Sequence, residues 1–393
     1  MRLVAIGDVV GEPSTWNPQE STSREPFRYI DISSVDAREK RITGTTTLNP
    51  SEAPSRARQL VQPGDVLVST VRPNLNAVAI VPDELDGATA STGFAVLRPN
   101  AERIEPSYLY QGVRSPGFVR GMIARATGAS YPAVTERVVR KSTIPLPPLA
   151  EQRRIAAMLD KADAIRRKRR EAIRLLEEFL RSAFLDMFGD PVRNPKGWEV
   201  VRLQDLCSRV VDCPHSTPKY AAGVTDFPCI RTSDLQGGFL DWSSTKYVKQ
   251  DHYDERIGRH VPAEGDVLYS REGERFGIGA LLPSNTRVCL GQRMMLFRPD
   301  AKSVTSAFLW GLLNSGGVYH MANQLVGGST SPHINVHDIR QFRVYKPPLD
   351  LQMTYEKTYL TAAACREKII GVGTRECEAL FNSLAQEAFG GEG

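Results

Sequence analysis

The feature of this sequence that most constrains its fold is an internal repeat with a shift of about 200 residues. Pro63-Gly64-Asp65-Val66-Leu67 is matched 201 residues later by Glu264-Gly265-Asp266-Val267-Leu268. Other blocks keep the same register to within one residue, among them Val96-Leu97-Arg98-Pro99 with Leu296-Phe297-Arg298-Pro299, and Pro147-Pro148-Leu149 and Gln152 with Pro347-Pro348-Leu349 and Gln352. The shift is far longer than solenoid periods. The sequence therefore predicts two copies of one globular module.

Each module is predicted to be α+β. The chain has 393 residues, more than one hydrophobic core usually supports, and 41% of them are hydrophobic, which is typical of a globular protein. Short β-rich runs bounded by turn residues predict strands, and apolar runs after them predict short helices. The strands are expected around residues 77–81, 93–98, 276–282 and 293–298, and the helices at 106–114 and 305–315.

A long helix is predicted after the first module. Ile155, Met158, Ala162 and Ile165 begin a stripe with alternating three- and four-residue steps, which is a coiled-coil pattern. The run from Glu151 to about Phe188 would be ~55 Å long at the helical rise per residue. In the second arm, Tyr355, Ala362 and Ile369 continue such a stripe, and Gly371 and Gly373 then weaken it.

Two apolar stripes in one chain most simply bury against each other, and antiparallel pairing would place the modules at opposite ends. The predicted fold is therefore two pseudo-repeated α+β domains separated by a long antiparallel coiled coil. Two such domains on a rigid spacer suit duplex DNA, whose major-groove faces recur every ~34 Å. The net charge of +5 and a pI near 8.8 permit nucleic-acid binding without demonstrating it.

The compartment is predicted to be the cytoplasm. The six cysteines form no Cys-x-x-Cys pair, which favours reduced thiols over a disulfide framework. The first ten residues are too short and too soon interrupted to form a signal peptide, and no apolar run reaches membrane-spanning length. No membrane partner is expected.

Several blocks resemble the specificity subunits of type I restriction-modification systems. The segment Ile144-Pro145-Leu146-Pro147-Pro148-Leu149-Ala150-Glu151-Gln152-Arg153-Arg154-Ile155 resembles the central conserved segment of that family, and Phe188-Gly189-Asp190-Pro191 resembles its end. Asp212 to Tyr220 and Arg271-Glu272-Gly273 are similar to internal motifs of a target-recognition domain. Ser69 to Pro73 and Thr127 to Pro132 match another common subfamily.

The resemblance implies four regions and a non-catalytic role. Target-recognition domains would occupy residues 1–146 and 193–346, and conserved helical regions 147–192 and 347–393. The chain would bind a bipartite site on double-stranded DNA and position two adenine-N6 methyltransferase subunits, joined by nuclease/translocase subunits. It would hold no cofactor itself, because S-adenosylmethionine, ATP and magnesium would belong to those partners.

Candidate DNA contacts are donors and acceptors in the segments that differ between the modules. Arg suits guanine, Asn and Gln suit adenine, and Ser, Thr and Lys suit phosphates. Asp65 and Asp266 are expected to be structural, because aspartate caps turns and repels phosphate. The candidates are Arg72, Asn74, Asn76, Ser91, Thr92, Ser130 and Tyr131 in the first module, and Thr217, Lys219, Tyr220, Arg271, Arg275, Gln292, Arg293, Ser329, Thr330, His333 and Asn335 in the second.

Candidate partner contacts lie on the first long helix. They are Ile155, Met158, Leu159, Ile165, Arg166 and Arg170. The basic run from Arg166 to Arg170 leaves three interpretations open: a solvated helix face, a docking surface for a partner, and a phosphate contact.

Motifs for catalysis or metal binding are incomplete. Gly273, Gly277 and Gly279 could suggest a nucleotide-binding loop, but Pro283 follows where a helix is required, so a hairpin is expected. Asp300-Ala301-Lys302 is expected to be a solvated turn rather than part of a nuclease site. The histidines His333 and His337, and the set Cys207, Cys213 and His215, lack complete zinc-ligand spacing.

Two rival functions stay open on the sequence. A self-contained nuclease or methyltransferase would be active alone, although the phosphate-loop motif and an Asn-Pro-Pro or Asp-Pro-Pro motif followed by an aromatic residue are missing from the sequence. A structural coiled-coil adaptor would show no salt-dependent retention on DNA.

Overall fold

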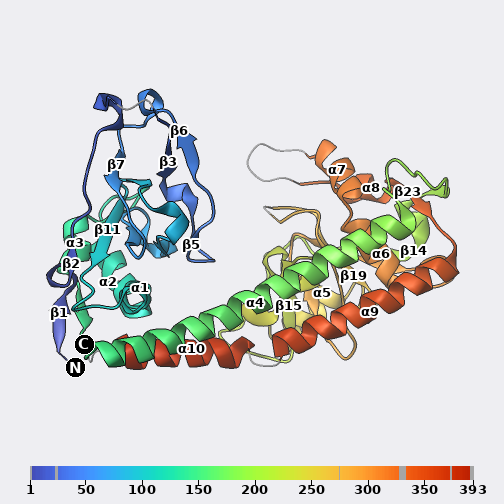
Figure 1. The fold of residues 1–393 in the computed structure, drawn as a ribbon. Helices are drawn as coiled ribbons and strands as arrows, with labels where there is room; N and C mark the ends of the chain where they lie inside the picture. Colours follow the sequence, from blue (N-terminus) through green and yellow to red (C-terminus); the bar gives the residue numbers. More distant parts are fainter. Residues whose placement is uncertain (1, 23–24, 274, 327–332, 372–373, 390–393) are drawn as a thin grey trace. The chain divides into compact units, whose positions relative to one another are not determined.

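The computed structural model describes residues 2–22, 25–273, 275–326, 333–371 and 374–389 (Figure 1). Internal contacts divide the chain into two compact units. Unit 1 comprises residues 1–169 and 371–393, and unit 2 comprises residues 170–370. Each unit contains one copy of the sequence repeat. Among the described residues, no helix combines the length and the hydropathy needed to cross a membrane.

The central sheet of each unit has four strands and the same topology. Its order is β2-β11-β8-β9 in unit 1 and β14-β22-β19-β20 in unit 2, with antiparallel neighbours throughout. β8 and β19 are buried along their whole length, as their apolar runs require. The bounds are β2 Val10–Gly11, β8 Val66–Ser69, β9 Val78–Ile80, β11 Phe94–Pro99, β14 Cys207–Asp212, β19 Val267–Ser270, β20 Gly279–Leu281 and β22 Met294–Pro299.

A second sheet is also repeated. Unit 1 has the order β6-β3-β10-β7 and unit 2 the order β18-β15-β21, and in both a parallel pair joins strands distant in sequence. These pairs are β3 with β10 and β15 with β21. The bounds are β3 Phe27–Ile30, β6 Thr46–Leu48, β7 Ala57–Leu60, β10 Thr89–Ser91, β15 Pro228–Ile230, β18 Lys246–Tyr247 and β21 Cys289–Leu290.

Two-stranded pairings complete each module. The first strand of each module pairs antiparallel with its last, β1 with β12 and β13 with β23. Short hairpins are formed by β4 with β5 and by β16 with β17. The bounds are β1 Leu3–Ala5, β4 Val35–Asp36, β5 Arg41–Ile42, β12 Thr143–Pro145, β13 Glu199–Arg202, β16 Leu235–Gln236, β17 Phe239–Leu240 and β23 Arg343–Lys346.

Three short helices follow the central sheet in each unit. The sequence predicted the first helix of each set, at residues 106–114 and 305–315. Ser115 and Ser315 cap the second helix of each set by accepting a hydrogen bond from the backbone three residues on. Unit 2 has one more α-helix, α5, which has no α-helical counterpart in the described part of unit 1. The bounds are α1 Pro106–Val113, α2 Pro116–Arg125, α3 Glu136–Lys141, α5 Gln250–Ile257, α6 Ser306–Leu313, α7 Gly316–Gln324 and α8 Val336–Arg340.

Long helices pack in antiparallel pairs within each unit (Figure 1). The helices are α4 (Leu149–Phe188), α9 (Leu349–Gly371) and α10 (Thr374–Phe389). In unit 1 the Arg166 guanidinium lies 4.7 Å from the Phe381 ring centroid, and the charge of Glu387 acts on Arg154. In unit 2 the ring centroids of Phe184 and Tyr355 are 5.5 Å apart. The predicted fold class is confirmed, and the described part of the second arm consists of two helices, α9 up to Gly371 and α10 from Thr374. The four-region division of the chain stays a prediction.

One glutamine in each unit joins the start of a long helix to its module. The Gln152 amide accepts a hydrogen bond from the Glu105 N–H and donates to the carbonyls of Arg103 and Pro147. Gln352 makes the same three hydrogen bonds with Thr305, Ser303 and Pro347. The repeat is thus a repeat of contacts as well as of sequence.

Candidate nucleic-acid interface

Two loops of unit 1 that the sequence analysis selected lie side by side. We call residues 70–77, which connect β8 to β9, the hairpin loop, and residues 126–135, which connect α2 to α3, the helix loop. Val71 forms a β-bridge with Ala133, and the Arg72 N–H donates to the Pro132 carbonyl at 2.7 Å. The candidates Arg72 and Tyr131, 59 positions apart in the sequence, are therefore brought together.

The hairpin loop presents Arg72 to solvent in a fixed backbone conformation. Arg72 has a φ of 49°, in the left-handed region, and its exposed guanidinium lies 4.6 Å from the centroid of the Tyr131 ring. Tyr131 is 68% exposed, and Asn74 and Ser130 are exposed beside them. A stacked arginine, an amide and a hydroxyl on one edge are side chains that can bind bases and phosphates.

Three other candidates of unit 1 have different surroundings. Asn76 donates from its amide nitrogen to the Arg114 carbonyl at 3.1 Å, so it holds the loop to α1. Ser91 is only 2% exposed, and its hydroxyl accepts from the Gly93 N–H. Thr92 has an exposed side chain, and its N–H donates to the Arg56 carbonyl at 2.8 Å.

Unit 2 repeats the pairing of the two loops. Its hairpin loop is residues 271–278, between β19 and β20, and its helix loop is residues 325–335, between α7 and α8. Glu272 forms a β-bridge with His333, and the Ile334 N–H donates to the Arg271 carbonyl at 3.1 Å. The candidates Ser329 and Thr330 of this helix loop lie outside the described residues. The sequence-predicted hairpin at the glycines is confirmed, since β19 and β20 pair antiparallel.

The two arginines beside this bridge differ in exposure. Arg271 is 7% exposed, and its Nε donates to Asp212 at 3.1 Å while its Nη2 lies 3.3 Å from Nδ1 of His215. The Arg293 side chain is 46% exposed and forms a 3.4 Å ion pair with Glu272. Arg293 is therefore the more available of the two for an external ligand. His333, the β-bridge partner of Glu272, and Asn335 are also exposed, and Asn335 donates to Asp338.

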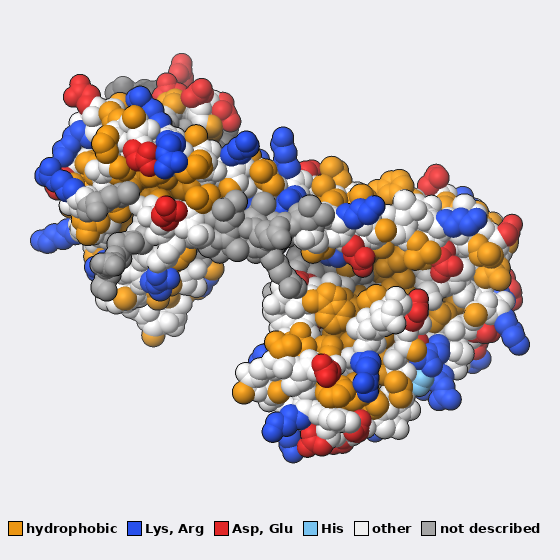
Figure 2. Space-filling view, turned by 90° about the horizontal axis from the view of Figure 1, so that it is seen from below, with side chains coloured by type: hydrophobic (Ala, Val, Ile, Leu, Met, Phe, Trp, Pro, Cys, Tyr) orange, Lys and Arg blue, Asp and Glu red, His pale blue; other side chains and the backbone are white. Residues whose placement is uncertain are grey.

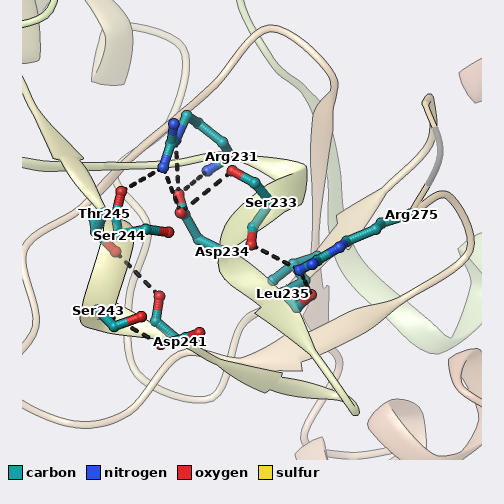
Figure 3. Close-up of polar contacts among 9 residues, drawn as sticks. All are labelled: Arg231, Ser233, Asp234, Leu235, Asp241, Ser243, Ser244, Thr245 and Arg275. Carbon is teal, nitrogen blue, oxygen red and sulfur yellow. Dashed lines mark hydrogen bonds and ion pairs between the residues drawn. The ribbon is translucent and has the colours of Figure 1, made fainter. Parts of the chain in front are cut away.

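Arg275 spans from the hairpin loop to the turn before β16 (Figure 3). Its Nη1 donates to the carbonyls of Ser233 and Leu235 at 2.9 and 3.3 Å. On the other side of that turn, the carboxylate of Asp234 accepts hydrogen bonds from the guanidinium and the N–H of Arg231. That hydrogen bonding raises the pKa of Arg231. Arg275 thus has an internal structural partner.

A third segment of unit 2, residues 212–220, carries Thr217, Lys219 and Tyr220. Thr217 and Lys219 are exposed, and the Nζ of exposed Lys246 lies 4.8 Å from the centroid of the Tyr220 ring. Burial raises the pKa of Tyr220, so its hydroxyl stays protonated and can donate. Lys246 was missed by the sequence analysis because it lies in no motif, although a lysine beside strand-forming residues could have suggested it.

The Oε1 of Gln292 is buried and has no hydrogen-bond partner among the described residues, so this end of the side chain is not open to an external ligand. The other chemistry considered from the sequence is not assembled. Among the described residues, no group of three or more His, Cys, Asp or Glu side chains could hold a metal ion. His215 lies 3.1 Å from Asp212, and burial raises the pKa of Cys207 to about 12. Asp300 accepts hydrogen bonds within its own turn, from the Lys302 N–H and the Ser303 hydroxyl.

The candidate partner residues of α4 divide by burial. Ile155 and Leu159 are 5% and 0% exposed and belong to the core of unit 1, whereas Met158 is half-buried. Ile165 is 37% exposed, and Arg166 pairs with Asp163 at 3.4 Å. Arg170 is exposed. Other apolar side chains are exposed in unit 2, namely Leu175, Phe179 and Leu185 of α4, and Met353 and Leu360 of α9. Figure 2 shows hydrophobic side chains among charged ones on one face of the molecule.

The family model and the curated relatives that match this chain all belong to one family. The family model described as type I restriction modification DNA specificity domain matches residues 40–175 and 195–355. The type I restriction enzyme MjaVIII specificity subunit of Methanocaldococcus jannaschii is 24% identical over 58% of this chain and 57% of its own length. The HindI specificity subunit of Haemophilus influenzae is 27% identical over 37% of this chain and 32% of its own. The chain thus spans about half the length of the first relative and a third of the second.

Solved structures share the fold along nearly the whole chain. A chain from a type I R-M system, studied for its complex assembly and conformational transition, is 29% identical, with a TM-score of 0.51 and coverage of 99% of this chain and 97% of its own. The type I restriction-modification S subunit from M. genitalium is 10% identical, with a TM-score of 0.56 and coverage of 99% and 96%. The latter likeness is one of fold.

Proposed function

The chain belongs to the type I restriction-modification DNA specificity family, as its sequence motifs predicted, and from this premise we propose that it is a non-catalytic DNA-recognition subunit. Each unit binds one half of a bipartite site on double-stranded DNA. The bases of the two half-sites differ because the two units differ in the loops that would contact them. The partner subunits carry out the chemistry.

The observation that carries this proposal is the repeated pairing of the hairpin loop with the helix loop. Val71 with Ala133 in unit 1 and Glu272 with His333 in unit 2 form the same β-bridge on the same scaffold. The side chains placed there are nevertheless different: Arg72 lies beside Tyr131 in unit 1, whereas in unit 2 Glu272 of the hairpin loop pairs with Arg293, which lies just before β22. A constant scaffold with variable polar loops is what two half-sites of different sequence require.

The exposed groups have the chemistry for base and phosphate contacts. Arg72 and Arg293 can donate two hydrogen bonds to a guanine, and Asn74 and Asn335 can pair with an adenine. Thr217 and Lys219 are suited to phosphates. Asn76, Ser91, Arg271 and Arg275 remain candidates, although their hydrogen bonds within the chain favour a supporting role. Gln292 also remains a candidate, with its Oε1 buried. Ser329 and Thr330 stay predictions from the sequence.

We further propose that two adenine-N6 methyltransferase subunits dock on the long helices and that nuclease/translocase subunits join them. The exposed apolar side chains of α4 and α9 support this, since Phe179 and Leu360 are 52% and 60% exposed on regular helices. Ile165, Arg166 and Arg170 remain candidates for contact on α4, and the same holds for half-buried Met158. S-adenosylmethionine, ATP and magnesium are then bound by the partners and not by this chain.

The proposed location is the cytoplasm, where such a complex meets DNA. Five of the cysteines, Cys207, Cys213, Cys229, Cys289 and Cys365, are free thiols. This agrees with a reducing compartment.

Mapping of methylated adenines in the host genome tests the function. With the chain present, methylation should fall on one split sequence, and deletion of the chain should abolish that pattern. Exchange of residues 1–145 for the module of another family member should change one half-site and leave the other. Methylation irrespective of sequence, or an unchanged pattern after the exchange, would contradict the proposal.

Docking on the helices has a separate test. Phe179→Asp should weaken co-purification of the methyltransferase subunits, because a carboxylate would replace an apolar contact. Val224→Asp is the matched control, since Val224 is 82% exposed and lies outside the helices. Equal recovery of the partners with both variants would argue against this surface.

The rival adaptor function predicts no DNA retention. Binding of the full chain and its partners to duplex DNA should weaken steeply as salt rises, because phosphate contacts release counterions. Retention that does not depend on salt would favour the adaptor.

A further inference from the structure

Helix α5 carries a buried arginine that holds the segment containing Thr217. Arg256 is 4% exposed. Its Nη1 donates to the Ser216 carbonyl at 3.1 Å, and its Nη2 donates to the Pro214 carbonyl at 3.3 Å. Its Nε donates at 2.8 Å to the carbonyl of Leu290, the last residue of β21. One side chain therefore joins α5, the sheet and the segment 214–216.

The charge of Arg256 is not paired with a carboxylate in any ion pair of the described residues. Burial of a cation without a counterion is unfavourable, even when carbonyl oxygens accept its hydrogen bonds. Its field reaches the neighbouring sheet: the hydrogen bond from Cys229 and then the charge of Arg256 lower the pKa of the Cys289 thiol, against the effect of burial. A neutral residue at position 256 would avoid this cost. The role of Arg256 is therefore expected in the three backbone segments that its hydrogen bonds join.

A second side chain, one turn earlier on α5, holds the other end of the same segment. His252 is 8% exposed, and its Nε2 accepts a hydrogen bond from the Lys219 N–H at 3.1 Å. Its Nδ1 lies 2.9 Å from the Glu255 carboxylate, to which it donates when Nε2 is the acceptor. The segment 214–219 is thus fixed at both ends, and the exposed side chains of Ser216, Thr217 and Lys219 lie between them.

This support of a loop by two side chains of an α-helix is found in unit 2. At the position of α5 in the repeat, unit 1 has a single 3-10 turn, Pro50–Glu52. In the described part of unit 1, no α-helix takes the place of α5. The two modules therefore differ in the support of a loop as well as in the loop itself.

We propose that Arg256 and His252 are positioning residues that set the half-site specificity of unit 2 by fixing the backbone of residues 214–219. The inference rests on the proposed function and extends it to residues that make no DNA contact. Thr217 and Lys219 are the groups that meet DNA. Arg256 and His252 determine where those groups lie.

The test uses the full chain co-purified with its partner subunits and a duplex library randomised in both half-sites. The exchange of residues 1–145 assigns each half-site to a unit. For Arg256→Met we expect at least a tenfold loss of discrimination at the half-site of unit 2 and none at the other, which is an internal control. The slope of log affinity against log salt should not change, because Arg256 touches no phosphate.

Conservative variants separate positioning from stability. Arg256→Lys keeps the charge and part of the hydrogen bonding, without the fork geometry, and should lose less discrimination than Arg256→Met. His252→Gln keeps an acceptor for the Lys219 N–H and should retain specificity that His252→Leu loses. If Arg256→Met does not fold, the comparison of His252→Gln with His252→Leu tests whether the support of residues 214–219 sets the specificity.

Three results would overturn the inference. They are unchanged discrimination in the folded variants, equal loss at both half-sites together with a lower melting temperature, and a salt slope reduced by about 0.9, which would indicate a direct phosphate contact. Failure of the proposed function is distinct, because the wild-type complex would then show no sequence preference at either half-site.

Discussion

The guanidinium of Arg298 donates two hydrogen bonds to the carboxylate of Asp266, each 2.7 Å long. Asp266 is 1% exposed and also accepts from the Ala263 N–H at the start of its turn. In unit 1, Arg98 and Asp65 form the same two-point pair, and Asp65 accepts from the Gln62 N–H. The expectation that both aspartates are structural is confirmed. The pair fixes the turn before β19 or β8, and the hairpin loop begins where that strand ends.

Loss of this pair should destabilise its unit. We expect Asp266→Asn to lower the free energy of unfolding by about 3 kcal/mol, because it leaves the arginine without its buried partner. Urea unfolding of the full chain measures this. Asp205→Asn is the control, since Asp205 pairs with Arg202 on the surface, and it should change little. A small effect for Asp266→Asn would mean that the buried pair is not a support of the sheet.

The glutamines at the start of the long helices should also contribute to stability, because each is the hydrogen-bond partner of several backbone groups. Gln352→Leu keeps the size but leaves a buried N–H and two carbonyls without their partner, at a cost of about 1–3 kcal/mol for each such group. A clear drop in the melting temperature should follow. Gln324→Leu, at an exposed position, is the control. Equal melting temperatures would contradict the role of Gln352.

Arg293 and Arg275 of unit 2 are both exposed, but only Arg275 donates to backbone carbonyls of its own unit, so the two should differ in salt dependence. Arg293→Ala should reduce the slope of log affinity against log salt by about 0.9 if Arg293 meets one phosphate, and should relax one base position if it meets guanine. Arg275→Ala should leave the slope unchanged, because Arg275 donates to two carbonyls of its own unit. Binding titrations at several salt concentrations decide this. A reduced slope with Arg275→Ala would move that residue to the DNA surface.

A lysine of unit 1 should make stability depend on pH in the alkaline range. Burial, and then the charge of Arg114, lower the pKa of Lys40 from 10.5 to about 8. Between these values the unfolded state binds more protons than the folded state, so stability rises with pH. The stability of the wild type relative to Lys40→Met should therefore increase from pH 8 to pH 10 in urea unfolding. A constant difference would show that Lys40 is not perturbed.

Thiol labelling should follow burial. Iodoacetamide at pH 8 should modify exposed Cys365 in the folded chain and leave Cys213, Cys229 and Cys289, which are buried. Cys207 should also stay unmodified, because burial raises its pKa to about 12. Peptide mapping by mass spectrometry identifies the sites. Modification of the buried cysteines before unfolding would reveal local opening of unit 2.

Much of the fold could be predicted because the repeat places each block twice. The strands expected around 93–98 and 293–298 are found at Phe94–Pro99 and Met294–Pro299. The helix expected from Glu151 begins two residues earlier, at Leu149. Periodicity and turn residues act locally, so they fix such elements well. The pairing order of the sheets was not predicted, because it depends on contacts between distant strands.

The candidate interface was predicted only in part. Arg72 and Tyr131 were selected from separate motifs, and they do meet. Arg271 was selected by its motif, yet its side chain is buried against Asp212. Arg256 and Lys246 were not selected, since neither lies in a recognisable motif.

The sequence by itself determined the duplication, the α+β modules, the long helices and the family, because these follow from patterns within or between aligned segments. Only the tertiary structure decided which polar side chains remain free for a ligand. Arg293 is exposed, whereas Arg256 is enclosed by Pro214, Ser216 and Leu290, at least 34 residues away in the chain. Exposure depends on which distant segments fold against a side chain, and a local pattern does not contain that information.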